Sequence, residues 1–271
     1  MKLAMNPATT MPASFEEDVI AYAGAGFDAM EIWLSKIDDY MKDGKDLKDA
    51  SQLMNDNNMA AAGACFSGLT FSADETEKES FDQFKTRLQM CQALGAETLV
   101  VIPTVPGSPV TPDKYDILVE GMARCCDIAE PYGVSLAIEF IKGGGLIGSV
   151  ATAADIANRT QRDNIGVLFD TFHFYMGISK VSDIRNLSGD DILLIHFNDC
   201  PDVYREIAED GMRILPGEGA IPLQEILGAA RDTGYNGFVS LEIFNQDIWD
   251  LDVKEAAEIS YEKASSFLEN I

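Results

Sequence analysis

The run N-I-G-V-L-F-D-T-F-H-F-Y-M-G, residues 164–177, places an acidic side chain at the end of an apolar segment. Ile165–Phe169 are apolar or small, Asp170 follows them directly, and His173 comes three positions later. An unpaired buried charge is costly, so a strand that ends in a carboxylate makes sense if the carboxylate meets a cation. The run therefore predicts a buried strand with a metal-competent group at its C-terminal end.

Three other apolar runs share this design. They are S-L-A-I-E-F, I-L-L-I-H-F-N-D and F-V-S-L-E-I-F, and their metal-competent side chains are Glu139, His196 and Glu242. Apolar strands without strict alternation are typical of parallel sheets that are covered on both faces. The four runs are thus expected to be neighbouring strands of one such sheet.

Strand-like runs alternate with helix-length segments along the chain. Strands are expected at 2–6, 29–35, 60–67, 98–104, 135–140, 165–171, 192–198 and 238–244. Helices are expected at 14–26, 47–57, 74–94, 112–131, 151–159, 180–187, 221–233 and 253–268. Eight βα units in this length favour a closed (β/α)₈ TIM barrel, a single domain over residues 1–271. An open doubly wound sheet is disfavoured because no Gly-rich dinucleotide or phosphate motif follows a strand.

Composition limits the partners. Lys and Arg number 20 against 45 Asp and Glu, a formal net charge of −25, which disfavours binding to nucleic acid or to anionic membranes. No window approaches about 18 consecutive apolar residues, and the N-terminal M-K-L-A-M-N-P has no sustained apolar run, so neither a membrane span nor a signal peptide is expected. Five cysteines without a C-x-x-C pair predict reduced, buried thiols and a cytoplasmic location.

The C-terminal ends of barrel strands face one mouth, so Glu139, Asp170, His196 and Glu242 are expected to converge there. Three carboxylates and one imidazole suit one divalent cation, Mn²⁺, Mg²⁺, Co²⁺ or Zn²⁺. The cation would reduce the charge of the carboxylates from −3 to about −1, whereas close like charges without it would raise each other's pKa. A single such residue is ordinarily solvated or structural, but four at matching strand ends favour a metal site.

Two further residues are candidates for substrate binding. His173 lies one turn beyond Asp170, where it could cap a helix, face solvent, or bind a substrate hydroxyl in the mouth. The longest connection, Asp199–Gly219, is charged and predicts a flap over the mouth. Arg213 lies on this flap, either as a loop salt bridge or as a substrate contact.

Four motifs carry a resemblance to a known family. They are M-N-P-A-T-T (5–10), D-I-A-E-P-Y-G-V-S-L-A-I-E-F (127–140), D-T-F-H-F (170–174) and R-I-L-P-G-E-G (213–219). With them the chain resembles, over nearly its whole length, the xylose-isomerase-like sugar isomerases and epimerases, and within these the inosose (2-keto-myo-inositol) isomerases of inositol catabolism. The resemblance implies a barrel, often paired into homo-oligomers, that acts on a small sugar or cyclitol ketone.

The resemblance also implies residue roles. The metal ligands would be Glu139, Asp170, His196 and Glu242, with Mn²⁺ as the first expectation. Glu139 and Glu242 would also be the catalytic acid and base, moving an α-proton through an enediolate while the metal acts as Lewis acid. His173 and Arg213 would contact the substrate.

Several alternatives remain open at this stage. Ketose 3-epimerases and hydroxypyruvate isomerases are similar too, but the epimerases carry an arginine where this chain has Asp202. An inosose dehydratase would begin with the same proton abstraction. Endonuclease-IV-like nucleases need many histidines, and this chain has two. A sugar-binding barrel without catalysis is the non-enzymatic alternative.

Overall fold

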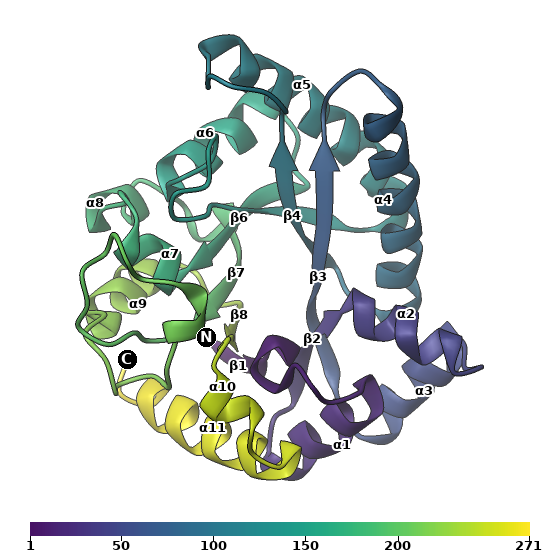
Figure 1. Cartoon of the computed structure of the whole chain (residues 1–271), viewed down its shortest axis with the longest axis vertical. Helices are drawn as coiled ribbons and strands as arrows, with labels where there is room; N and C mark the ends of the chain where they lie inside the picture. The colour runs from purple at the N-terminus through teal and green to yellow at the C-terminus, as the bar shows by residue number, and fades with distance from the viewer.

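The computed structural model describes residues 1–271 and confirms the TIM barrel. Eight parallel strands close into one barrel, each paired with the next in sequence and β8 paired with β1. The helices lie around the outside of the ring of strands (Figure 1). The strands are β1 (Lys2–Met5), β2 (Ala29–Trp33), β3 (Ala60–Thr70), β4 (Thr98–Thr104), β5 (Ser135–Glu139), β6 (Ile165–Asp170), β7 (Ile192–Phe197) and β8 (Phe238–Leu241).

At least one helix follows each strand. They are α1 (Phe15–Ala25), α2 (Leu34–Lys42), α3 (Leu47–Asp56), α4 (Glu75–Leu94), α5 (Pro112–Ala129), α6 (Val150–Thr160), α7 (Thr171–Met176), α8 (Val181–Ile184), α9 (Leu223–Asp232), α10 (Gln246–Trp249) and α11 (Val253–Leu268). Capping residues determine where several of these helices begin and end. Ser14 and Glu17 form a capping box at the start of α1, and Gly26 closes that helix in the left-handed conformation.

Three expectations about element boundaries are wrong. The chain turns into α2 directly after β2, because Leu34 and Ile37 lie one turn apart and are both buried. The helix expected over 180–187 is limited to α8, four residues long. Strand β8 ends at Leu241, and Ile243 then donates its backbone N–H to the Thr9 hydroxyl instead of to a neighbouring strand.

Apolar side chains fill the barrel and the layer between strands and helices. Five successive strands, β3 to β7, each contribute one buried side chain to a small apolar cluster. Its members are Cys65, Val100, Ala137, Leu168 and Leu194. All five cysteines of the chain are buried and unpaired, as the sequence predicts. None of the helices is both long and apolar enough to cross a bilayer.

A buried ion pair joins α1 to α2 beside the β1–α1 connection. The Lys36 Nζ lies 2.6 Å from Asp18 Oδ2 and donates to the Thr10 carbonyl oxygen at 2.9 Å. The Thr10 hydroxyl donates to the other Asp18 oxygen at 2.7 Å. Burial raises the pKa of Asp18 to about 6, although Lys36 opposes that shift. The pair therefore carries charge in the core only because its hydrogen bonds are complete.

We expect Lys36→Met to lower the free energy of unfolding by about 3–5 kcal/mol, since it leaves the Asp18 carboxylate buried without its cation. The double variant Asp18→Leu/Lys36→Met should recover most of that loss. Because burial raises the folded-state pKa of Asp18, the loss should be smaller at low pH, where Asp18 is protonated, and should grow as pH rises through about 6. Urea unfolding measures each value, with Lys42→Met at the exposed Lys42–Asp39 pair as the control. Equal effects of Lys36→Met and Lys42→Met would contradict the prediction.

Candidate active site

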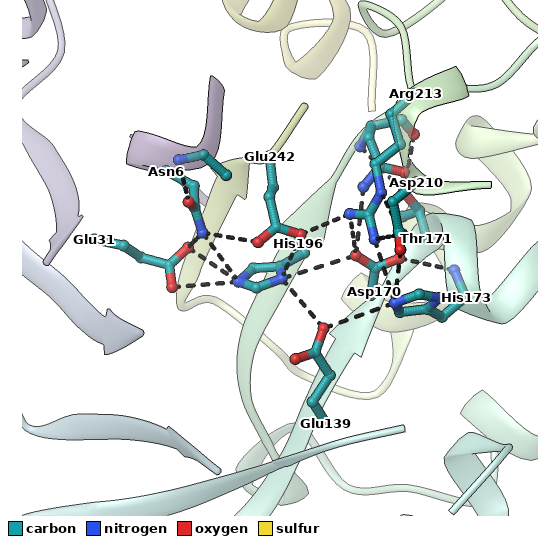
Figure 2. A network of polar contacts seen from close by, with 12 residues as sticks. Asn6, Glu31, Glu139, Asp170, Thr171, His173, His196, Asp210, Arg213 and Glu242 are labelled. Atoms are coloured by element: carbon teal, nitrogen blue, oxygen red, sulfur yellow. Dashed lines mark hydrogen bonds and ion pairs between the residues drawn. The ribbon is translucent and has the colours of Figure 1, made fainter. Parts of the chain in front are cut away.

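Four side chains from consecutive strands meet at the C-terminal mouth of the barrel (Figure 2). Glu139 and Asp170 are the last residues of β5 and β6, His196 lies in β7, and Glu242 follows β8 directly. Their nearest ligand atoms all lie within 4.8 Å of one another. Parallel pairing places Asp170 beside His196, which explains how residues far apart in sequence share one centre. The convergence expected from the sequence is present, and the role of metal ligand stays a prediction.

The His196 imidazole shows how a cation would fit among these groups. Its Nδ1 is buried without a hydrogen-bond partner and faces Glu242 Oε2 at 3.0 Å, Asp170 Oδ2 at 3.7 Å and Glu139 Oε1 at 3.8 Å. A buried nitrogen without a partner, ringed by three carboxylates, is a set of donor atoms that a divalent cation would satisfy together. The residues therefore fit the metal that the sequence predicts.

The two candidate acid/base carboxylates differ in acidity. Burial raises the pKa of Glu139 to about 8, and the carboxylates of Glu242 and Asp170 add to that rise. Burial opposes the charged form of Glu242 as well, but His196 and Arg213 outweigh it and lower the pKa of Glu242 to about 2. Two carboxyl groups in one site with pKa values pushed apart are typical of acid/base chemistry.

Arg213 belongs to this cluster and not only to its loop. The side chain is 1% exposed, and its Nη1 lies 2.8 Å from Asp170 Oδ2 and 2.6 Å from Glu242 Oε2. Its Nη2 also pairs with the half-exposed Asp210 at 2.7 Å, so the loop salt bridge considered from the sequence exists beside the buried contacts. The guanidinium lies over the rings of Phe172 and Phe244. It thus holds a fixed positive charge at the mouth.

His173 faces the same centre from the first turn of α7. Asp170 caps that helix by accepting the His173 backbone N–H at 2.8 Å, which fixes the imidazole beside the cluster. The His173 Nε2 lies 3.2 Å from Arg213 Nη2 and 3.9 Å from Glu139 Oε1. Burial lowers the pKa of His173, which favours the neutral ring, and a neutral ring can accept a hydrogen bond from the guanidinium through Nε2. Contact with substrate stays a prediction for both His173 and Arg213.

The connection from β7 to α9, expected as a flap, is anchored at its base. The buried Asp199 carboxylate accepts the backbone N–H groups of Gly217, Gly219 and Ile221 at 2.9–3.0 Å. A Cβ at Gly219 would lie 2.4 Å from the Asp199 carboxylate, so this position requires glycine. The P-G-E-G motif is therefore a turn closed on Asp199, and this turn fixes the path of the segment that carries Arg213 into the mouth.

An open cleft adjoins Glu139 between the connections that follow β4 and β5. Its volume is about 280 Å³, and Val105, Lys114, Gly144 and Ile147 are among the residues that line it together with Glu139. A cavity of this size and mixed lining is suited to a small polar ligand.

Sequence reasoning missed two residues of the site. Glu31, in the middle of β2, is fully buried, and its Oε2 lies 3.2 Å from His196 Nε2. Asn6, directly after β1, donates its amide to Glu31 Oε1 at 2.9 Å and to Glu242 Oε1 at 3.1 Å. Both residues have a signal in the sequence. The run A-M-E-I-W places Glu31 inside an apolar strand, and M-N-P-A-T-T places the Asn6 amide at the end of the first strand. Asp202, the position of the epimerase arginine, is exposed and lies outside the cluster.

Comparison with known proteins places the chain in a family. The model of the xylose isomerase-like TIM barrel family matches residues 19–270. The chain is 30% identical to an inosose isomerase of Bacillus velezensis over 269 residues, which is 97% of this chain and 95% of that protein. It is 31% identical to an inosose isomerase of Bacillus licheniformis, with 97% and 96% covered.

A solved structure agrees with these relatives. The crystal structure of the IOLI protein with a bound zinc atom superposes with a TM-score of 0.91 at 26% identity, covering 100% of this chain and 99% of that chain. The barrel, the polar cluster at its mouth and the family match over most of the length lead to one assignment. This chain belongs to the xylose isomerase-like TIM barrel family.

Proposed function

We propose that this chain is a metal-dependent inosose isomerase, which moves the ketone of a 2-keto-myo-inositol by α-proton transfer. The observation that carries the chemistry is the buried cluster of three carboxylates and the His196 Nδ1 within 4.8 Å of one another. The substrate class rests on the relatives named inosose isomerase, which match nearly the full chain at about 30% identity.

The proposed cofactor is one divalent cation held by Glu139, Asp170, His196 and Glu242. Mn²⁺ is our first choice because it accepts mixed carboxylate and imidazole ligands, and Co²⁺, Mg²⁺ and Zn²⁺ are the other candidates. When bound, the cation would polarise the ketone and the neighbouring hydroxyl and so acidify the α-C–H bond.

The residues of the chain perform the proton transfer. One carboxylate of the pair Glu139 and Glu242 removes the α-proton, and the same or the other carboxylate returns a proton to the former carbonyl carbon. The proton of the α-hydroxyl passes to the former carbonyl oxygen, so that the ketone moves by one carbon. Arg213 donates toward the negative charge that develops on the substrate oxygens, and His173 binds a hydroxyl.

The substrate would lie against an aromatic surface formed by Trp33, Phe66 and Phe244. Trp33 meets Phe66 and Phe244 edge-to-face, with ring centroids 6.2 Å apart in both pairs. Phe66 is 44% exposed, so apolar surface is available to the C–H face of a cyclitol ring.

We also propose a single-domain enzyme that works in the cytoplasm as a homo-oligomer and binds neither nucleic acid nor membrane. Five buried, unpaired cysteines support a reducing compartment. The net charge of −25 supports the exclusion of polyanions.

Turnover in D₂O tests the proposal. The protein, loaded with Mn²⁺, is incubated with inososes and separately with ketoses, and the products are analysed by NMR. We expect interconversion of inososes with deuterium incorporated at the carbon that receives the proton. Epimerised ketoses with untouched inososes would favour a 3-epimerase, and a dione product would favour the dehydratase. Product free of deuterium at every pH would contradict a base that exchanges with solvent.

A further inference from the structure

Glu31 is a buried acid that the proposed chemistry does not use. Its side chain is fully buried, yet it approaches the centre from the side of His196 opposite to the three candidate ligand carboxylates (Figure 2). Both Glu31 oxygens lie near His196 Nε2, at 3.1 and 3.2 Å, while His196 Nδ1 faces the ligand carboxylates. A buried carboxylate without a partner would be costly, so the contact with the imidazole requires a hydrogen at Nε2.

That hydrogen fixes which imidazole nitrogen is available to a cation. A neutral imidazole carries one N–H, so a hydrogen held at Nε2 by Glu31 leaves the lone pair at Nδ1. Nδ1 is the atom directed at Glu139, Asp170 and Glu242. An outer carboxylate that accepts the second N–H of a metal-binding histidine orients the ring and makes it a stronger ligand.

Asn6 fixes Glu31 in turn and joins it to Glu242. The Asn6 Oδ1 accepts the Ala8 backbone N–H at 2.8 Å, which sets the orientation of the amide. Its Nδ2 then donates to Glu31 Oε1 at 2.9 Å and to Glu242 Oε1 at 3.1 Å. These two donations use both amide hydrogens, so the 3.5 Å approach of Nδ2 to His196 Nε2 is not needed as a bond.

The β1–α1 connection holds Glu242 through the backbone as well. The Asn6 backbone N–H donates to the Leu241 carbonyl oxygen at 2.9 Å, and the Thr9 hydroxyl donates to the same oxygen at 3.0 Å. The Ile243 N–H donates to that hydroxyl at 3.0 Å. The residues on both sides of Glu242 are therefore bonded to the M-N-P-A-T-T segment.

The net charge of the groups around His196 also favours a bound cation. Glu31 is the fourth carboxylate that faces His196, so that one divalent cation and the Arg213 guanidinium would leave this group with a net charge of −1. A fourth negative charge at this distance strengthens the attraction for a cation in a partly desolvated site.

We propose that Glu31 and Asn6 are positioning residues of the metal site: Glu31 holds the hydrogen of His196 at Nε2 so that Nδ1 binds the cation, and Asn6 locks Glu31 to the ligand Glu242. This inference rests on the metal site of the proposed function. Glu31 lies outside the set of metal ligands and does not touch the cation.

The affinity of the protein for Mn²⁺ tests the proposed roles of Glu31 and Asn6. Glu31→Gln keeps the shape of the side chain, removes its charge, and places an NH₂ where one of the two carboxylate oxygens accepted a hydrogen. We expect it to weaken Mn²⁺ binding, measured by calorimetry on the metal-free protein, by about 10–100-fold. Asn6→Ala should weaken binding in the same direction, and Glu31→Asp should recover part of the loss. Glu97→Gln, an exposed change of the same charge, is the matched control.

A spectroscopic measurement separates positioning from general stability. The chain has two histidines, so ¹⁵N-labelled imidazoles of the Zn²⁺-loaded protein give few signals. We expect a strongly downfield Nε2-bound proton for His196, which moves upfield in Glu31→Gln at saturating Zn²⁺. Binding of the metal through His196 Nε2, or Mn²⁺ affinity of Glu31→Gln equal to that of Glu97→Gln, would overturn the inference. Failure of the unmodified protein to bind any divalent cation would instead overturn the proposed function.

Discussion

Replacement of Glu242 by glutamine is expected to lower kcat for inosose isomerisation by about 10²–10⁴-fold, the usual contribution of a positioned acid or base. The amide has the shape of the carboxyl group but neither accepts a proton from carbon nor returns one. Glu139→Gln should cause a loss in the same range. Initial rates with Mn²⁺ at saturation give kcat and KM separately, and the metal content of each variant shows whether binding or proton transfer was lost.

The control for these variants is Glu97→Gln, which removes one negative charge from an exposed position before β4. Its kcat should equal that of the unmodified protein. If Glu242→Gln keeps its bound metal and full turnover, Glu242 is not a catalytic group. If ligand binding occurs without any turnover in the unmodified protein, the chain is a sugar-binding barrel instead of an enzyme.

The sequence was informative wherever one residue broke a local pattern. An acid or a histidine at the end of an apolar run identified Glu139, Asp170, His196 and Glu242, because parallel strands in a closed barrel all end at one mouth. Eight alternations of strand and helix predicted that closure, and the pairing of β8 with β1 bears it out.

The sequence was less informative where a role depends on register or on a distant contact. Glu31 is the third of five residues in β2, and only the stagger of the barrel brings it level with the end of β7. Asp199 reads as one more acid in an acidic connection, yet its carboxylate closes the turn that leads from Arg213. The α2 helix was missed because its short apolar face follows a strand without a turn signal.

Removal of the metal is the second change with a large expected effect. Chelation should abolish turnover, and Mn²⁺ or Co²⁺ should restore it, because no group of the chain can replace the cation as Lewis acid. A cation present at about 100 times its Kd adds about 2.7 kcal/mol to the free energy of unfolding. Thermal unfolding with and without chelator measures that increment, and turnover that is indifferent to chelator would contradict a metal-dependent mechanism.

The effect of the metal should also depend on pH in a definite direction. In the metal-free protein, burial opposes the charge of His196, but Glu242 and Glu31 outweigh it and raise the pKa of His196 well above its ordinary value. Burial raises the pKa of Glu139 to about 8. Both groups thus hold protons near neutrality, and a cation must displace them, so Kd should fall as pH rises.

The stabilisation of the protein by the metal should also increase as pH rises. Groups with raised folded-state pKa values stabilise the metal-free protein at low pH, and that stability is lost as pH rises through the folded values. The difference in Tm between the metal-loaded and the chelated protein should therefore widen between about pH 6 and 8. Calorimetry in buffers of different ionisation enthalpy should detect protons released on binding. A Kd that is constant over this range would mean that neither His196 nor Glu139 exchanges its proton for the cation, and the ligand set would then have to exclude both.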